Sequence, residues 1–190
     1  MISEERIEKN KQIFEEKNKE YGIFTKELSE FLGEDFFLAP ASPSLEMYNA
    51  YPGGLVEHLL KQCKYTININ NILPESIRID KKTIVKAVFL SEIGKTFLFK
   101  LNDDEFTRKR GKMYVYNDNE MVVMNVSERS IYYATKYGVQ LTEEEYQAIL
   151  FSDKEPNERF VKGASKTLFR IMKMGYELAL MEDKNGKVGH

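Results

Sequence analysis

Two apolar helices predicted in the middle of the chain limit what this sequence can fold into. Residues 51–69 read YPGGLVEHLLKQCKYTINI, and after a polar break residues 80–99 read DKKTIVKAVFLSEIGKTFLF. At about 100° per residue, apolar side chains cover most of the circumference of helices predicted over 54–72 and 81–93. Such helices lie at the centre of a fold, since only a narrow side of each can face water. The pattern therefore predicts a mainly α-helical protein organised around this pair.

Each of these helices carries one polar feature on its apolar surface. In the first it is His58, and in the second it is Ser91-Glu92, which IGK follows at 93–95. We expect Gly94 to end the second helix in a left-handed conformation. A carboxylate buried at the carboxyl end of a helix needs local compensation, because both burial and the helix dipole oppose its charge. The candidate cations are His58, Lys95, Arg110 and Arg129. Among these we expect His58 or a nearby arginine to lie within hydrogen-bond reach of Glu92.

The rest of the chain is predicted to surround this pair within a single domain. The apolar runs MYVY and MVVM flank a polar NDNE segment, which is typical of a small hairpin. Gly33 is expected to close a second N-terminal helix, Ser127 to cap a later one, and Thr142 to open the next with a capping box. The predicted parts of residues 1–190 are N-terminal helices over 1–33, a core over 34–182, a β-hairpin insertion at about 113–124 and a flexible tail over 183–190.

The composition is that of a globular cytoplasmic protein. Of the 190 residues, 42% are hydrophobic and 31% are charged. No apolar run approaches the roughly 20 residues that a membrane-spanning helix needs, and residues 1–20 lack the apolar segment of a signal peptide. The single cysteine, Cys63, excludes a disulfide framework and fits a reducing compartment. A net charge of −2 gives no overall attraction to nucleic acid, so such binding would require a local basic patch.

Several segments resemble the HD-domain superfamily of metal-dependent phosphohydrolases. The family's opening motif, APA followed by GGL and a histidine, is similar to Ala39–Ser42 followed by Tyr51–His58. Its LHDIGK signature is similar to Leu90–Lys95, and its late ADxLA motif to Gly175–Ala179. The resemblance covers most of the chain, from about 36 to 180. It implies an HD-domain-like helical bundle with the small hairpin as an insertion.

The resemblance also implies which residues stand where the family binds its metal ions. His58 keeps the first ligand, Ser91 and Glu92 replace the histidine and aspartate of the HD pair, and Tyr176 stands at the final aspartate. Two possible ligands are too few for metal-assisted attack of water on a phosphate. We therefore expect no catalytic residue, no metal and no cofactor at this remnant site, which comprises His58, Ser91, Glu92, Lys95 and Tyr176.

Three readings of this remnant site follow. His58 and Glu92 could form a structural pair in a protein that has lost catalysis and serves as a binding or structural module. They could instead hold a divalent metal in a remodelled phosphohydrolase acting on nucleotides or nucleic acid, with help from Asp153 or Glu128. The cleft could also persist as a noncatalytic pocket for a nucleotide or other phosphate ligand, because guanidinium groups suit phosphate. The candidate phosphate-binding residues, which would act beside Lys95, are Arg108, Arg110, Lys112 and Arg129.

Partners are less constrained than the fold. The basic run 108–112 could equally be a solvated loop with no ligand. The SEIGK variant is similar to HD-like proteins encoded by tailed phages, which implies a host-cytoplasmic or virion location and a possible protein partner in virion assembly. We expect no membrane association, and the pattern does not predict an oligomeric state.

Overall fold

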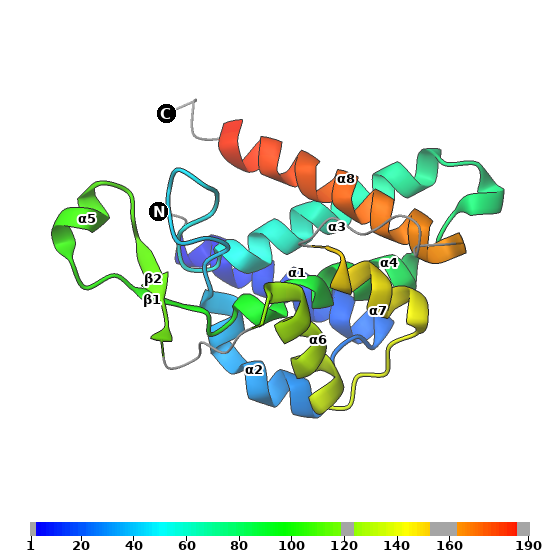
Figure 1. Ribbon diagram of the computed structural model, residues 1–190, viewed down its shortest axis with the longest axis horizontal. Coiled ribbons are helices and arrows are strands. Elements are labelled where there is room, and N and C mark those ends of the chain that lie inside the picture. The colour runs from blue at the N-terminus through cyan, green and yellow to red at the C-terminus, as the bar shows by residue number, and fades with distance from the viewer. Residues whose placement is uncertain (1–2, 119–123, 153–162, 186–190) are drawn as a thin grey trace.

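The computed structural model describes residues 3–118, 124–152 and 163–185, and these form eight α-helices and one two-stranded antiparallel sheet (Figure 1). The prediction of a mainly α-helical fold with a small antiparallel strand pair is confirmed. Among the described residues no helix is both long and apolar enough to cross a bilayer. The helices are α1 Glu4–Tyr21, α2 Lys26–Leu38, α3 Gly54–Ile72, α4 Lys81–Ser91, α5 Glu105–Lys109, α6 Val126–Lys136, α7 Glu143–Leu150 and α8 Gly163–Asn185. The strands are β1 Phe99–Leu101 and β2 Tyr114–Tyr116. Two short 3-10 turns are η1 Glu75–Ile77 and η2 Ile93–Lys95.

Helices α3 and α4 form the centre of the molecule, as the apolar pattern predicts. Helix α3 packs against α1, α2, α4 and, most extensively, α8, while α4 contacts α6 and α7 on its other side (Figure 1). From Val85 to Ser91 every residue of α4 except Lys86 is buried. Burial of that apolar surface supplies the main driving force of the fold.

The helix boundaries follow local capping signals, with three corrections. Thr25, Asp80 and Thr142 accept backbone hydrogen bonds at the starts of α2, α4 and α7. Gly33 does not close α2 but kinks it at φ 51°, ψ −149°, after which the helix continues to Leu38. Helix α6 starts one residue ahead of Ser127, with Asn125 as its cap.

The third correction concerns the end of α4, which stops at Ser91 instead of continuing to residue 93. Gly94 is not a left-handed cap but lies inside the 3-10 turn η2. A Cβ on Gly94 would lie 2.5 Å from the carbonyl oxygen of Val126, so the glycine is needed for the close approach of α6. The Gly94 N–H donates to Ser130 Oγ at 2.9 Å, which fixes η2 against α6.

Of the hairpin predicted at 113–124, the first run forms β2, which pairs with β1, so that Phe99 faces Tyr116 and Leu101 faces Tyr114. The tilted contact between the Phe99 and Tyr116 rings, 5.4 Å between centroids, favours this register. Of the second predicted run, residues 121–123 lie outside the described residues.

Residues 99–116, called the arm below, extend from the helical body and carry α5 between their two strands (Figure 1). Two backbone hydrogen bonds fix the arm to the segment ahead of α3. Leu45 N donates to Gly111 O at 2.8 Å, and Tyr114 N donates to Pro43 O at 3.0 Å. The arm therefore has a defined position on the body.

The first three residues of the tail predicted over 183–190 belong to helix α8. Helix α8 continues to Asn185, because Asp183 is buried against α3 instead of facing solvent. Residues 186–190, including His190, lie outside the described residues.

The close crossing of α3 and α8 depends on Gly175. A Cβ there would lie 2.2 Å from Thr66 Oγ1 and 2.9 Å from Thr66 N. Alanine normally favours a helix by up to about 1 kcal/mol over glycine, whereas forcing a methyl group into a packed contact costs about 1–3 kcal/mol. We predict that Gly175→Ala lowers the free energy of unfolding, as measured by urea denaturation. Met174→Ala, at a neighbouring position that is 54% exposed, is the control and should change it by less than about 0.5 kcal/mol.

Candidate functional site

The imidazole of His58 lies fully buried on α3 and faces the end of α8. Its Nδ1 is 2.8 Å from Asp183 Oδ2, and since a carboxylate only accepts hydrogen bonds, Nδ1 carries the proton. The other Asp183 oxygen accepts a hydrogen bond from Lys61, one turn further along α3. Lys61 also lies 3.1 Å from Glu57, which pairs with Arg6 of α1 at 2.6 Å. These residues form the outer cluster: Arg6, Glu57, His58, Lys61 and Asp183.

The outer cluster keeps Asp183 ionised although its carboxylate is buried. Burial alone raises the pKa of Asp183, but the hydrogen bonds from His58 and Lys61 outweigh burial, so the pKa lies below its ordinary value of 3.8. For Lys61, burial acts in the opposite direction and lowers the pKa. The hydrogen bond to Asp183 and the charge of Glu57 outweigh burial, so the pKa of Lys61 is raised above its ordinary value. The charged forms of both groups are therefore favoured, and they tie α8 to α3.

A second group of polar side chains, the inner cluster, surrounds Glu92 at the end of α4. The Lys95 ammonium donates to Glu92 Oε1 at 2.6 Å and to the Tyr48 hydroxyl at 2.8 Å. The Tyr48 and Tyr176 hydroxyls are 3.0 Å apart. Glu92 and Lys95 are only 8% and 7% exposed, so this is a buried ion pair. The inner cluster comprises Tyr48, Glu92, Lys95 and Tyr176.

Glu92 does have a nearby cation, but this is Lys95, one of the four candidates, and not the expected His58 or an arginine; His58 pairs with Asp183. The reason is local geometry. The 3-10 turn η2 brings residues three apart onto one side, so the Lys95 side chain folds back onto Glu92. Among the described residues the ion pair of Glu92 is with Lys95, and not with Arg110 on the arm or Arg129 on α6.

The two clusters meet through aromatic rings. The His58 ring centroid is 4.8 Å from that of Tyr48 and 5.0 Å from that of Tyr176. Burial, and then the charge of Glu92, raises the pKa of both tyrosines, so their hydroxyls stay protonated at neutral pH. The neutral phenols thus belong to the hydrogen bonds of the inner cluster and contact the outer cluster through the His58 ring.

Ser91, the remaining member of the predicted remnant site, serves the backbone. Its hydroxyl donates to Val88 O at 2.8 Å within α4. Its carbonyl accepts a hydrogen bond from Ser130 Oγ at 3.0 Å, and the same Ser130 hydroxyl receives the Gly94 N–H. Ser91 therefore helps to join α4, η2 and α6.

The donor set does not fit the metal centre that the HD resemblance implies. His58 Nε2 and Glu92 Oε2 are buried and have no hydrogen-bond partner among the described residues, so these two atoms could face a ligand. The Lys95 ammonium, however, already neutralises Glu92 and would repel a divalent cation. Within the described ranges no three His, Cys, Asp or Glu side chains are grouped in a way that could hold a metal ion. Of the proposed helpers, Glu128 accepts the Asn125 N–H at the start of α6, and Asp153 lies outside the described residues.

The predicted phosphate-binding residues lie in two separate places. Arg108, Arg110 and Lys112 belong to the arm, on one side of the helical body, whereas Arg129 lies on α6 within the body (Figure 1). Arg129 is only 4% exposed, while Arg110 and Lys112 are exposed. Lys95 is engaged with Glu92. A single pocket lined by all of these cations is therefore not formed by the described residues.

Asp183 and Tyr48 are the important site residues that the sequence reading missed. Asp183 follows Tyr176 by seven residues, or two helical turns, so both lie on the stripe of α8 that faces α3. Extending the buried stripe of α8 past residue 181 would have indicated Asp183. Tyr48 precedes α3 in a segment without regular periodicity, so no local signal marks it.

The buried ion pair yields a stability prediction. Glu92→Ala leaves the Lys95 ammonium buried with only the Tyr48 hydroxyl as a hydrogen-bond acceptor. Removing one partner of a buried pair typically costs about 3–5 kcal/mol, so we expect a loss of that order in urea unfolding. Glu92→Gln keeps an oxygen acceptor and should cost less. Glu177→Ala, on the exposed side of α8, is the control; equal stability of Glu92→Ala and this control would show that the pair contributes nothing.

Asp183 yields a prediction about pH. The pKa of Asp183 is lower in the folded protein than the ordinary value of 3.8. Its contribution to stability is therefore complete above pH 3.8 and is lost as the pH falls through the pKa of the folded state. The free energy of unfolding of the wild type should therefore be higher than that of Asp183→Asn at neutral pH. The difference should shrink below pH 3.8. Urea titrations of both proteins from about pH 2.5 to 6 measure this. A difference that stays constant across that range would contradict an ionised, hydrogen-bonded Asp183.

Comparisons of the chain with protein-family models, with curated proteins and with solved structures find no match.

Proposed function

We propose that this protein is a catalytically degenerate relative of the HD-domain phosphohydrolases that works as a binding module. The observation that carries the proposal is the ammonium of Lys95, 2.6 Å from Glu92 and buried with it. A hydrolytic site of that family needs a divalent cation beside this carboxylate, whereas here a lysine supplies the positive charge. His58 is likewise held by Asp183. In this proposal the former centre has become a structural polar core.

The binding surface in this proposal is the arm. Exposed aromatic and apolar side chains lie there beside cations: Phe106 is 65% exposed, Tyr116 53% and Leu101 50%. The Arg110 guanidinium lies 5.0 Å from the centre of the Phe106 ring. An exposed ring with an arginine over it combines base stacking with phosphate pairing, which is the usual chemistry of single-strand recognition.

The charge of the arm is divided along its length. Asp104 caps the start of α5 and Glu105 lies in its first turn, while Arg108 and Lys109 lie in its last turn. Arg110 and Lys112 continue the basic end beyond the helix. The ligand class that fits this end is a nucleotide or short single-stranded nucleic acid, since its phosphates would meet the cations and its bases the exposed ring.

This proposal is tested by measuring how a labelled single strand of about 12 nucleotides binds the protein. The binding is monitored by fluorescence anisotropy between about 50 and 200 mM salt. Arg110→Ala with Lys112→Ala should weaken binding and reduce the salt slope by roughly 0.7 for each phosphate that no longer pairs with a cation. Phe106→Ala should cost about 1–3 kcal/mol for a stacked base. The matched control removes two exposed lysines from the helical body, Lys26→Ala with Lys82→Ala, and should leave the salt slope unchanged.

Two results would overturn the proposal. Absence of binding across mononucleotides and single strands would remove the arm as a nucleic-acid surface and favour a protein partner or an assembly role. Metal-dependent hydrolysis of a phosphate ester by the purified protein, abolished in His58→Ala, would instead restore the remodelled hydrolase.

A further inference from the structure

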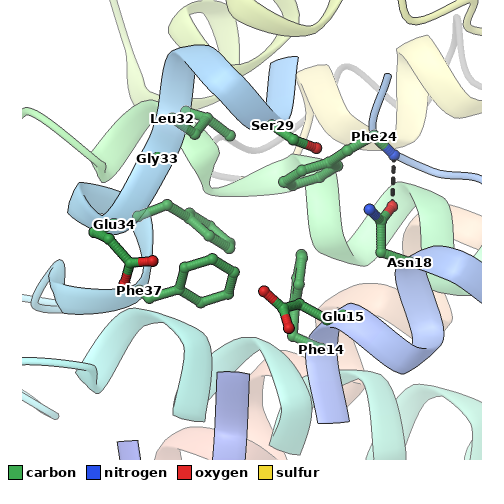
Figure 2. A pocket seen from close by; sticks show the side chains of 10 residues that line it. Phe14, Glu15, Asn18, Phe24, Ser29, Leu32, Gly33, Glu34 and Phe37 are labelled. Carbon is green, nitrogen blue, oxygen red and sulfur yellow. Dashed lines mark hydrogen bonds between the residues drawn. The ribbon is translucent and has the colours of Figure 1, made fainter. Parts of the chain in front are cut away.

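A separate pocket of about 300 Å³ lies between α1 and the kinked helix α2, away from both polar clusters (Figure 2). Its walls are mainly phenylalanine rings, and two carboxylates, those of Glu15 and Glu34, point toward these rings. The volume is at the lower end of the range for small-molecule sites. The rings are those of Phe14, Phe24, Phe36 and Phe37.

The kink at Gly33 gives this pocket its form. The backbone there adopts φ 51°, which favours glycine, and it interrupts α2 between the positions of Leu32 and Phe36. A Cβ added to Gly33 would meet no atom within 4 Å, so the glycine is required by backbone conformation and not by crowding. Of the four rings, Phe14 and Phe36 are buried, while Phe24 and Phe37 are partly exposed.

The ammonium group of Lys11 contacts two of the residues that line the pocket, Glu34 and Phe37. Lys11 Nζ lies 2.5 Å from Glu34 Oε1 and 5.1 Å from the centre of the Phe37 ring. The hydrogen bond to Glu34 raises the pKa of Lys11, and the charge of Glu15 acts in the same direction. Among the described residues Glu15 itself has no ion-pair partner. The negative charge at the rim therefore exceeds what the chain's own lysine compensates.

We propose that this pocket binds a small organic cation whose charge is surrounded by methyl groups, such as a quaternary ammonium. Aromatic ring faces attract such cations, and the methyl groups can be buried against the rings while the carboxylates neutralise the charge. An anionic ligand would be repelled by Glu15 and Glu34. A neutral apolar ligand of the same shape would pack against the rings without the electrostatic attraction.

Choline is the first probe, and its neutral carbon isostere, in which a quaternary carbon replaces the nitrogen, is the second. Titrations followed by NMR should show choline binding about tenfold more tightly than the isostere. A peptide containing trimethyllysine and the same peptide with unmodified lysine distinguish a protein-borne ammonium from a free one. Equal affinity for choline and its isostere would overturn the proposal.

Three variants test the assignment of charges without changing the phenylalanine core. Glu15→Gln should weaken choline binding several-fold, whereas Glu16→Gln, an exposed neighbour on α1 outside the pocket, should not. Lys11→Ala should strengthen choline binding, because it removes the ammonium that competes for Glu34 and Phe37. Failure of both Glu15→Gln and Lys11→Ala to change the affinity would show that the rim charges do not face the ligand, and the proposal would fall.

Discussion

The attachment of α8 to α3 through Asp183 is the contact on which the rest of the polar centre depends. Asp183 joins His58 and Lys61 of α3, which are more than 120 residues away in the chain. That contact holds α8 in place along α3, and so holds Tyr176 against the His58 ring. Tyr176 in turn meets Tyr48, and Tyr48 accepts a hydrogen bond from Lys95. Without α8 in this position Tyr176 would no longer shield the Glu92–Lys95 pair from water.

Burying the two charged pairs, Asp183 with Lys61 and Glu92 with Lys95, is opposed by the free energy of desolvation. Taking two ions out of water is unfavourable, and their mutual attraction repays it only when geometry and further hydrogen bonds are good. Asp183 satisfies this condition, since both of its oxygens have partners. Glu92 satisfies it less fully, because its Oε2 is buried without one among the described residues. A buried polar centre of this kind limits how the surrounding helices can pack, since few alternative arrangements would satisfy the same charges.

Local signals in the sequence predicted the helices but not their partners. The bounds of α3 agree with the prediction, and Thr142 opens α7 with the expected capping box, because caps and apolar periodicity are encoded within a few residues. The strand β1 and the partner of His58 were not predicted, and Glu92 pairs with Lys95 instead of the expected His58 or an arginine. The first two depend on contacts between separate segments of the chain, which no short window contains. The third depends on the turn η2, whose tight geometry brings Lys95 back onto Glu92.

The arm and the polar centre share one short piece of backbone. Pro43 and Leu45 hydrogen-bond to the arm, and the Ser42 hydroxyl bonds to the backbone of Tyr48, five residues after Pro43. The backbone that fixes the arm therefore also sets the position of Tyr48, whose hydroxyl accepts a hydrogen bond from Lys95.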